Sequence, residues 1–229
     1  MYPRTPQEIS PYARACLDAL EKQGLTQYIS LGGAFALAYY DEYRSTHDVD
    51  AWWIEPLPDE LQKSIIKTIE ESLQNFGKTR LRQWGDVVSV ELILENQTRF
   101  SFQIANRSAQ LEETLMAPWP HGARLDSLPD LVASKMVALV ARGAPRDFRD
   151  IYQLCQSGLY NAAGCWELWQ RRQSLINEDR TLDRAKLAVR THLARIERAR
   201  PLEAIADPHQ RTEAELVRRW FVQEFLRDV

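Results

Sequence analysis

The sequence contains few cysteines, no long apolar run and no recognisable export signal. Its three cysteines, Cys16, Cys155 and Cys165, follow no paired metal-ligand spacing, and their odd number argues against a disulfide framework. No apolar stretch approaches the roughly 20 residues that a membrane-spanning helix needs. No signal-peptide core follows the first residues. We therefore expect a cytoplasmic protein with reduced cysteines and no membrane association.

Several catalytic signatures are missing as well. The four histidines, His47, His121, His192 and His209, are scattered without the spacing of a zinc site. No nucleophile–histidine–acid motif stands out, and there is no Gly-x-x-x-x-Gly-Lys loop of the Walker type. Zinc hydrolases and P-loop enzymes are therefore not indicated.

An excess of positive charge is also lacking. The net charge of −3 gives no global field that would attract nucleic acid. Residues 171–200 are locally rich in arginine with few acids between. Such a run is usually a solvated helical face, and a surface that follows RNA phosphates is the alternative.

The segments of the chain indicate two lobes. Residues 1–108 alternate between helical and strand patterns, residues 125–229 are helical almost throughout, and Pro118, Pro120 and Gly122 mark the seam. The spacing of apolar residues predicts helices over residues 9–22, 34–43, 59–76 and 128–141, with a further helix beginning near residue 146. Alternation predicts strands over residues 28–31, 49–54, 87–94 and 99–104, the last two joined by a turn at 95–97.

Two pairs of residues in the first lobe suggest a site. Gly32-Gly33 ends a predicted strand and opens a helix, which brings backbone amides close to a phosphate, although such turns often use glycine for geometry alone. Asp48 and Asp50 begin the next strand, so their side chains point to the same face. Adjacent carboxylates repel unless a cation neutralises them, and this favours a Mg²⁺ site. Arg44, just upstream, is either a phosphate contact or an ordinary surface charge.

A second group of charged residues lies in the helical lobe. Lys135 interrupts an apolar helix, and Arg142 follows two turns later on the same side. A Gly143-Ala144-Pro145 break then precedes Arg146, Asp147 and Asp150. One interpretation is a helix cap with surface ion pairs. The other places Lys135 on nucleotide phosphates, with Asp147 and Asp150 orienting the basic residues or the acceptor.

These two groups together resemble the AbiEii-type nucleotidyltransferases, the toxins of type IV toxin–antitoxin and abortive-infection systems. Gly32-Gly33-Ala34-Phe35-Ala36-Leu37 with Arg44 to Asp50 is similar to the first family motif. The block from Lys135 through Arg142 to Arg146-Asp147-x-x-Asp150 is similar to the second, in the same order. The two motifs span residues 29–154, and the helical C-terminus carries no signature that matches.

The resemblance implies an α+β fold, with a polymerase-β-like lobe built on a mixed sheet and an all-helical C-terminal lobe. It implies Mg²⁺-dependent transfer of a nucleotide from an NTP to an acceptor, which in relatives can be the 3′ end of tRNA, and a cognate antitoxin as partner. By the same resemblance Asp48 and Asp50 hold metal, Gly32 and Gly33 form the nucleotide turn, Lys135 contacts the triphosphate and Asp147 is a further essential acid. The implied nucleotide-binding residues also include Arg44, Arg142, Arg146 and Asp150.

The sequence departs from the pattern at two positions. Ala34 stands where a small hydroxyl residue is common, and Gln103 stands on the strand where a third carboxylate is expected. Glu91, on the preceding strand, is the substitute metal ligand that we would test, although alternation also allows a solvent-facing residue there. Two other functions therefore stay open: a degenerate member that only binds nucleotide or a partner, and a nucleotidyltransferase that modifies a small molecule.

The tryptophans are expected to pack. Trp166 and Trp169, three residues apart, are predicted in the core of the helical lobe. Trp52 and Trp53 are expected to pack, one or both, against the helix over residues 59–76, with stacking on a base as the alternative.

Overall fold

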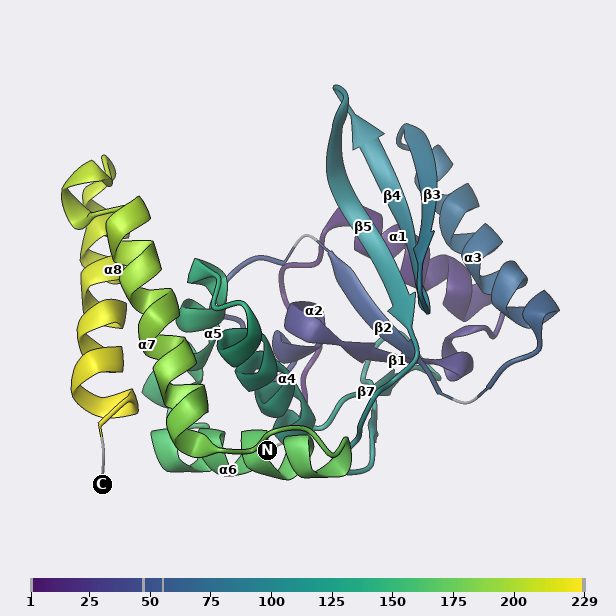
Figure 1. Ribbon diagram of the computed structural model, residues 1–229. Helices are drawn as coiled ribbons and strands as arrows, with labels where there is room; N and C mark the ends of the chain where they lie inside the picture. The colour runs from purple at the N-terminus through teal and green to yellow at the C-terminus, as the bar shows by residue number, and fades with distance from the viewer. Residues whose placement is uncertain (1, 47, 55, 228–229) are drawn as a thin grey trace. The chain divides into compact units, whose positions relative to one another are not determined.

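The computed structural model describes residues 2–46, 48–54 and 56–227 (Figure 1). The chain divides into two compact units, Met1–Leu131 and Val132–Val229, so the boundary falls within a helix. Residues 109–131 belong to the first unit, where they add two short strands to its sheet. None of the described helices is both long and apolar enough to cross a membrane.

The first unit is built on one mixed sheet of seven strands in the order β3-β4-β5-β2-β1-β7-β6. The pairs β2–β5 and β1–β7 are parallel, and the other neighbours are antiparallel. Together with the helical second unit, this sheet confirms the expected α+β class. The elements of the first unit are α1 (Pro11–Lys22), β1 (Ile29–Gly32), α2 (Gly33–Leu37), β2 (Val49–Trp53), α3 (Asp59–Gln74), β3 (Lys78–Trp84), β4 (Val87–Leu94), β5 (Gln97–Ala105), β6 (Leu115–Met116) and β7 (Arg124–Leu125).

The two faces of the sheet differ in chemistry. Alternation along β2, β4 and β5 sends buried apolar side chains such as Val49, Val90 and Phe102 to one face. The amphipathic helices α1 and α3 pack on each other, and α3 contacts β3 and β4, so they cover this apolar face (Figure 1). The opposite face carries polar side chains, including Asp50 and Gln103. We call it the polar face.

Most of the predicted elements are confirmed. Helices form over Pro11–Lys22 and Asp59–Gln74, and strands form over Ile29–Gly32, Val49–Trp53, Val87–Leu94 and Gln97–Ala105. The turn between the last two strands places Glu95 and Asn96 at positive φ, 51° and 60°, which suits the twist of a tight hairpin.

Two predictions of local structure were wrong or incomplete. The helix expected over residues 34–43 ends at Leu37 and continues as tighter turns, with Tyr39 N–H donating to the Ala36 oxygen and Tyr40 N–H to the Leu37 oxygen. The Tyr39 and Tyr40 hydroxyls donate to the backbone oxygens of Trp119 and Asp126. The strand Lys78–Trp84 was not predicted. Its side chains are exposed along almost the whole strand, so its sequence lacks the apolar alternation that marks a half-buried strand.

The second unit consists of helices. Trp166 and Trp169 are buried in its core, as predicted, and the Trp166 indole donates to the Phe225 backbone oxygen at 3.2 Å. Phe148 packs against Phe221 at a centroid distance of 4.7 Å. The helices are α4 (Leu128–Ala141), which begins in the first unit, α5 (Pro145–Gln156), α6 (Ala162–Leu175), α7 (Leu182–Ala199), α8 (Pro208–Trp220) and a closing π-helical turn at Phe221–Phe225.

Candidate active site

Asp48 and Asp50 lie at the beginning of β2 on the polar face. Asp48 precedes the strand, and its Oδ1 accepts from the Ser101 backbone N–H at 2.8 Å and from the Ser101 hydroxyl at 3.0 Å. Asp50 is in the strand and pairs in register with Gly32 on β1 and with Gln103 on β5. Asp48 is exposed and Asp50 half-buried, so a ligand can reach both carboxylates from solvent.

The two glycines make room for the side chains of β2. Gly33 has a φ of +61°, and a Cβ there would overlap Asp50 Oδ2 and lie 2.8 Å from Asp50 Cβ and Cγ. A Cβ on Gly32 would overlap Trp52 Nε1 and lie 3.2 Å from Asp126 Oδ2. Both positions therefore require glycine, one for its backbone conformation and both for space.

The helix that follows the glycine turn is short. The sequence placed a phosphate site at the N-terminus of a helix over residues 34–43, but α2 has five residues. A single turn sums few peptide dipoles, so its attraction for an anion is smaller than a long helix would supply. The observed role of Gly32 and Gly33 is steric: they let the backbone approach Asp50 and Trp52 closely.

A buried hydrogen-bond network around Asp126, which the sequence did not predict, holds Trp52 beside the candidate site. The Asp126 carboxylate accepts from the Ser30 hydroxyl at 2.9 Å, from the Trp52 indole at 2.8 Å and from the Arg107 guanidinium, which also lies over the Trp52 ring. Burial raises the pKa of Asp126, and its contacts with Arg107, Trp52 and Ser30 lower it in part. Trp52 is therefore fixed on the polar face beside Asp50, whereas Trp53 is buried on the opposite face.

A local signal for Asp126 is present in the sequence. Asp126 precedes Ser127-x-x-Asp130 at the start of α4. The Ser127 hydroxyl donates to the Asp130 carboxylate and accepts from the Asp130 backbone N–H. The Ser-x-x-Asp pattern predicts a helix start. It does not predict the partners of the preceding aspartate.

Within the described residues, no third acid joins Asp48 and Asp50, and no three His, Cys, Asp or Glu side chains converge as a metal site. Gln103 is the register partner of Asp50, and its amide donates to the Ser101 hydroxyl at 3.3 Å. Glu91 lies one strand further along the sheet, opposite Ser101, and its carboxylate accepts from Arg80 Nε at 2.8 Å and from Arg82 at 3.5 Å. Glu91 as a metal ligand stays a prediction.

The second predicted group forms two ion pairs, which connect α4 and the residue that follows it to α5. Lys135 Nζ lies 2.6 Å from Asp150 Oδ2, and Arg142 makes two bonds of 2.9 Å to the Asp147 carboxylate. Both aspartates are fully buried, and Asp147 also accepts from the Ala144 N–H at 2.9 Å, which caps α5. Lys135 in α4 and Arg142 just after its end thus meet Asp150 and Asp147, which are three residues apart on α5.

The remaining predicted residues occupy more open positions. Arg44 is partly buried in the segment before β2, with its guanidinium 5.7 Å from the Tyr43 ring centre. Arg146 is exposed in the first turn of α5. Asp48 and Asp50 belong to the first unit, and Lys135, Arg142 and Asp147 belong to the second. The roles of these residues toward a nucleotide stay predictions.

The sequence from residue 15 to residue 218 matches the family described as "Nucleotidyl transferase AbiEii toxin, Type IV TA system". The chain belongs to this family. The match confirms the resemblance seen in the two motifs and extends past residue 154 into the helical C-terminus, where the sequence showed no signature. The AbiEii-family chain is a nucleotidyltransferase of a type IV toxin–antitoxin system, and membership implies a nucleotide substrate and a cognate antitoxin.

Two solved structures are also similar to this AbiEii-family chain. JHP933 from Helicobacter pylori is 15% identical, with 93% of this chain and 91% of that chain covered and a TM-score of 0.49. A protein from H. pylori that is provisionally assigned as a nucleotidyltransferase is 16% identical, with coverage of 93% and 94% and a TM-score of 0.49. At these values neither likeness bears on the function. No curated protein matches the sequence.

Proposed function

We propose that the chain transfers a nucleotide from an NTP to an RNA acceptor in a Mg²⁺-dependent reaction at Asp48 and Asp50. The observation that carries the proposal is the pair of carboxylates on one face of β2, beside a glycine turn that leaves them room. In this reaction an acceptor hydroxyl oxygen bonds to the α-phosphorus while the bond to pyrophosphate breaks. The hydroxyl proton is released to solvent.

The donor set at Asp48 and Asp50 fits Mg²⁺. This ion is commonly held by one or two carboxylates together with waters and substrate phosphates, so two protein acids suffice. Ser101 fixes one oxygen of Asp48 through two hydrogen bonds and so orients this carboxylate. Bound Mg²⁺ would activate the acceptor hydroxyl and neutralise charge on the leaving pyrophosphate.

The basic residues of the family motifs are proposed to bind the triphosphate. Lys135 supplies a point charge, and Arg44, Arg142 and Arg146 supply further cations. Asp147 and Asp150 hold Arg142 and Lys135 through their ion pairs, so their proposed part is to orient these cations.

The acceptor is proposed to be RNA, with the 3′ end of tRNA as the first candidate, because the family resemblance implies an acceptor that can be this end. A toxin that blocked the 3′ end would stop aminoacylation and so translation. A small-molecule acceptor is the competing case. The appearance of label in a low-molecular-weight product instead of RNA would favour it.

One observation favours a second candidate function. Gln103, a neutral amide, faces Asp50 where a third carboxylate would strengthen metal binding. A site with two acids is also compatible with a protein that binds nucleotide and turns it over slowly or not at all.

The test is a transfer assay with purified protein, Mg²⁺, each α-labelled NTP in turn and total RNA. We expect label in RNA with at least one NTP, loss of transfer on removal of Mg²⁺ with EDTA, and loss in Asp48→Asn and Asp50→Asn. The matched control is Asp59→Asn, an exposed acid in the first turn of α3 on the far side of the sheet. Binding of an NTP by calorimetry without transfer to any acceptor would overturn the proposal in favour of the binding function.

A further inference from the structure

The edge strand β3 carries a row of cations that the reaction at Asp48 and Asp50 does not use. Side chains alternate along β3, so Lys78, Arg80, Arg82 and Trp84 share one side of the strand. Arg80 is the register partner of Glu91 and Arg82 the partner of Ser89, which places this side on the polar face. We call these four residues the β3 stripe.

The β3 stripe keeps a net positive charge and open contact area. The side chains of Arg80 and Arg82 are 52% and 56% exposed, and both contact a single buried carboxylate, that of Glu91. Lys78 is exposed, and Trp84 is 45% exposed although it is the largest apolar side chain on the strand. The Arg82 guanidinium lies 5.5 Å from the centre of the Trp84 ring, so a cation and an aromatic face are presented together.

Protection of the sheet edge does not account for this composition. Edge strands often carry lysine or arginine to prevent pairing with another chain, and Lys78, Arg80 and Arg82 fit that role. Trp84 does not, because an exposed aromatic residue on an edge strand invites association. The combination of evenly spaced cations with an exposed aromatic ring is instead typical of surfaces that bind single-stranded nucleic acid.

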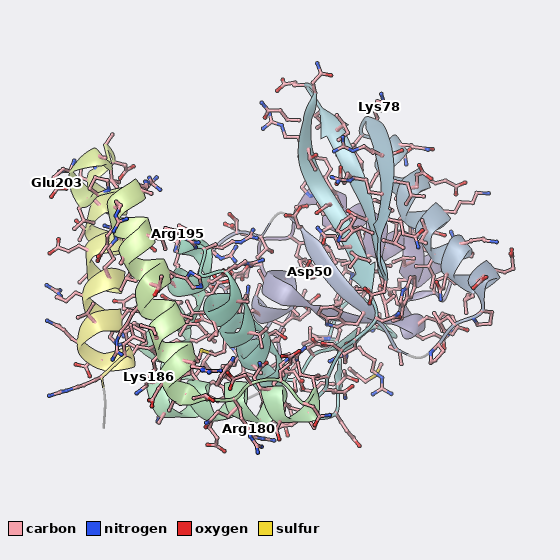
Figure 2. All side chains as sticks on the ribbon, viewed as in Figure 1. Asp50, Lys78, Arg180, Lys186, Arg195 and Glu203 are labelled. Carbon is pink, nitrogen blue, oxygen red and sulfur yellow. The ribbon has the colours of Figure 1, made fainter. Side chains whose placement is uncertain are left out.

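The register of the sheet connects the β3 stripe to the candidate active site. Arg82 pairs with Ser89, Ser89 with Gln103 and Gln103 with Asp50. Three strand spacings of about 4.8 Å separate the two ends of this row, so Arg82 and Asp50 lie roughly 14 Å apart. Figure 2 shows Lys78 and Asp50 on the same sheet. A chain of a few nucleotides spans that separation.

We propose that the β3 stripe binds a single-stranded segment of the nucleic-acid acceptor whose end reacts at Asp48 and Asp50. Alternate residues on a strand are about 6.8 Å apart, a spacing comparable to that of successive phosphates on an extended nucleic-acid strand, so Lys78, Arg80 and Arg82 contact neighbouring phosphates. Trp84 stacks on a base. The proposal rests on the proposed function for its choice of acceptor.

The test compares two variants that lose the same charge. Lys78→Gln/Arg82→Gln removes two cations from the β3 stripe, and Arg80 is kept because it neutralises the buried Glu91. Lys63→Gln/Lys67→Gln removes two exposed cations from α3, which covers the opposite face. The probe is a fluorescein-labelled, unstructured RNA oligonucleotide, and the measurement is its anisotropy over a range of salt concentrations. Equal melting temperatures establish that both variants fold.

We expect the stripe variant to bind the oligonucleotide at least tenfold more weakly than the α3 variant. The slope of log Kd against log salt should fall by about 1.4, because each phosphate contact to a single strand contributes about 0.7. Trp84→Ala should weaken binding by about 5- to 150-fold with little change of slope, and Trp84→Phe should restore most of it. Two results would overturn the inference. One is that the two charge variants bind the oligonucleotide with equal affinity. The other is that polyglutamate displaces the oligonucleotide equally well from the wild type and from Trp84→Ala.

Failure of this inference is distinguishable from failure of the proposed function. If wild-type protein labels RNA and the stripe variant keeps its KM for RNA, the reaction stands and the β3 stripe is not the acceptor surface. If wild-type protein binds the oligonucleotide through the β3 stripe and no NTP label is transferred, the surface stands and the reaction fails. Calorimetric binding of NTP should be the same in the wild type and the stripe variant.

Discussion

Asp50 faces Gln103 across the parallel pair of β2 and β5. This relationship defines the charge of the candidate site, because an amide stands beside the second aspartate where a further carboxylate would be in register. The Gln103 amide donates to the Ser101 hydroxyl, which in turn donates to Asp48. Gln103 therefore supports the orientation of Asp48 through Ser101 without adding negative charge.

Gln103→Glu should strengthen metal binding. A carboxylate at this position adds a third acid to Asp48 and Asp50, which increases attraction for a divalent cation. We expect the Mg²⁺ concentration for half-maximal transfer to fall roughly tenfold, on the order of 1.4 kcal/mol. The measurement is a Mg²⁺ titration of transfer at saturating NTP.

Gln103→Ala is the control for that substitution. It removes the hydrogen bond to Ser101 without adding charge, so it should leave the Mg²⁺ requirement unchanged and reduce the rate modestly. If Gln103→Glu and Gln103→Ala shift the Mg²⁺ titration equally, Gln103 does not face the metal.

Gly33→Ala should abolish most of the activity, whereas Gly24→Ala should not. Both glycines have positive φ, +61° and +67°, so alanine at either position costs about 1–2 kcal/mol of backbone strain. Only at Gly33 would the new Cβ overlap Asp50, since nothing lies within 4 Å of the corresponding atom at Gly24. Displacement of this carboxylate by about 1 Å can cost on the order of 100-fold in rate. Transfer rates and urea unfolding of the two variants make the comparison.

Comparison of Gly33→Ala with Gly24→Ala separates the effect of backbone strain from the effect of displacing Asp50. A rate loss confined to Gly33→Ala, measured where both variants are folded, supports the proposed arrangement. Equal rate losses in both variants would mean that the glycine turn affects transfer only through folding.

The polar pattern of the sequence explains which strands could be predicted. β4 and β5 alternate apolar and polar residues, because one face packs on α3 and its neighbours and the other is the polar face, and that alternation marks them as strands. β3 lies at the edge of the sheet, and its Leu81 is 51% exposed. A strand with little burial on either face leaves no hydrophobic period, so only its register with β4 reveals it.

Local spacing also limits what could be known of the site. Asp48 and Asp50 are two residues apart at the beginning of a strand, and Lys135 and Arg142 are seven residues apart at helical spacing, so the sequence could place each pair. Asp126 meets Ser30 and Trp52 from 96 and 74 residues away. Contacts at that separation depend on strand order, which no local pattern encodes.

Lys135→Met should reduce both stability and activity. The double variant Lys135→Met/Asp150→Asn should recover stability but not activity. Removal of Lys135 leaves Asp150, which is fully buried, without its cation, at a cost of about 3–5 kcal/mol. The asparagine of the double variant carries no charge and keeps polar atoms for the other contacts. If Lys135 binds the triphosphate, the double variant is stable and still has a raised KM for NTP. Recovery of KM together with stability would assign Lys135 a purely structural part.

Asp126→Asn should destabilise the first unit far more than Asp18→Asn. Both carboxylates accept a hydrogen bond from a tryptophan indole, at 2.8 Å from Trp52 and at 3.2 Å from Trp119, and an asparagine oxygen can replace that bond. Asp126 in addition neutralises Arg107, whose side chain is only 13% exposed. Loss of its charge leaves a nearly buried guanidinium unpaired, which costs about 3 kcal/mol or more.

Urea unfolding followed by tryptophan fluorescence measures this difference. The Asp18 variant should lose less than about 1 kcal/mol, since a single hydrogen bond at a partly exposed site contributes little. Transfer activity should also fall in Asp126→Asn at a temperature where the variant is folded, because Arg107, which lies over the Trp52 ring, loses its ion pair, and Trp52 packs against Gly32 beside Asp50. Equal stabilities of the two variants would show that Arg107 finds another partner or solvent, and that the network is not what fixes Trp52.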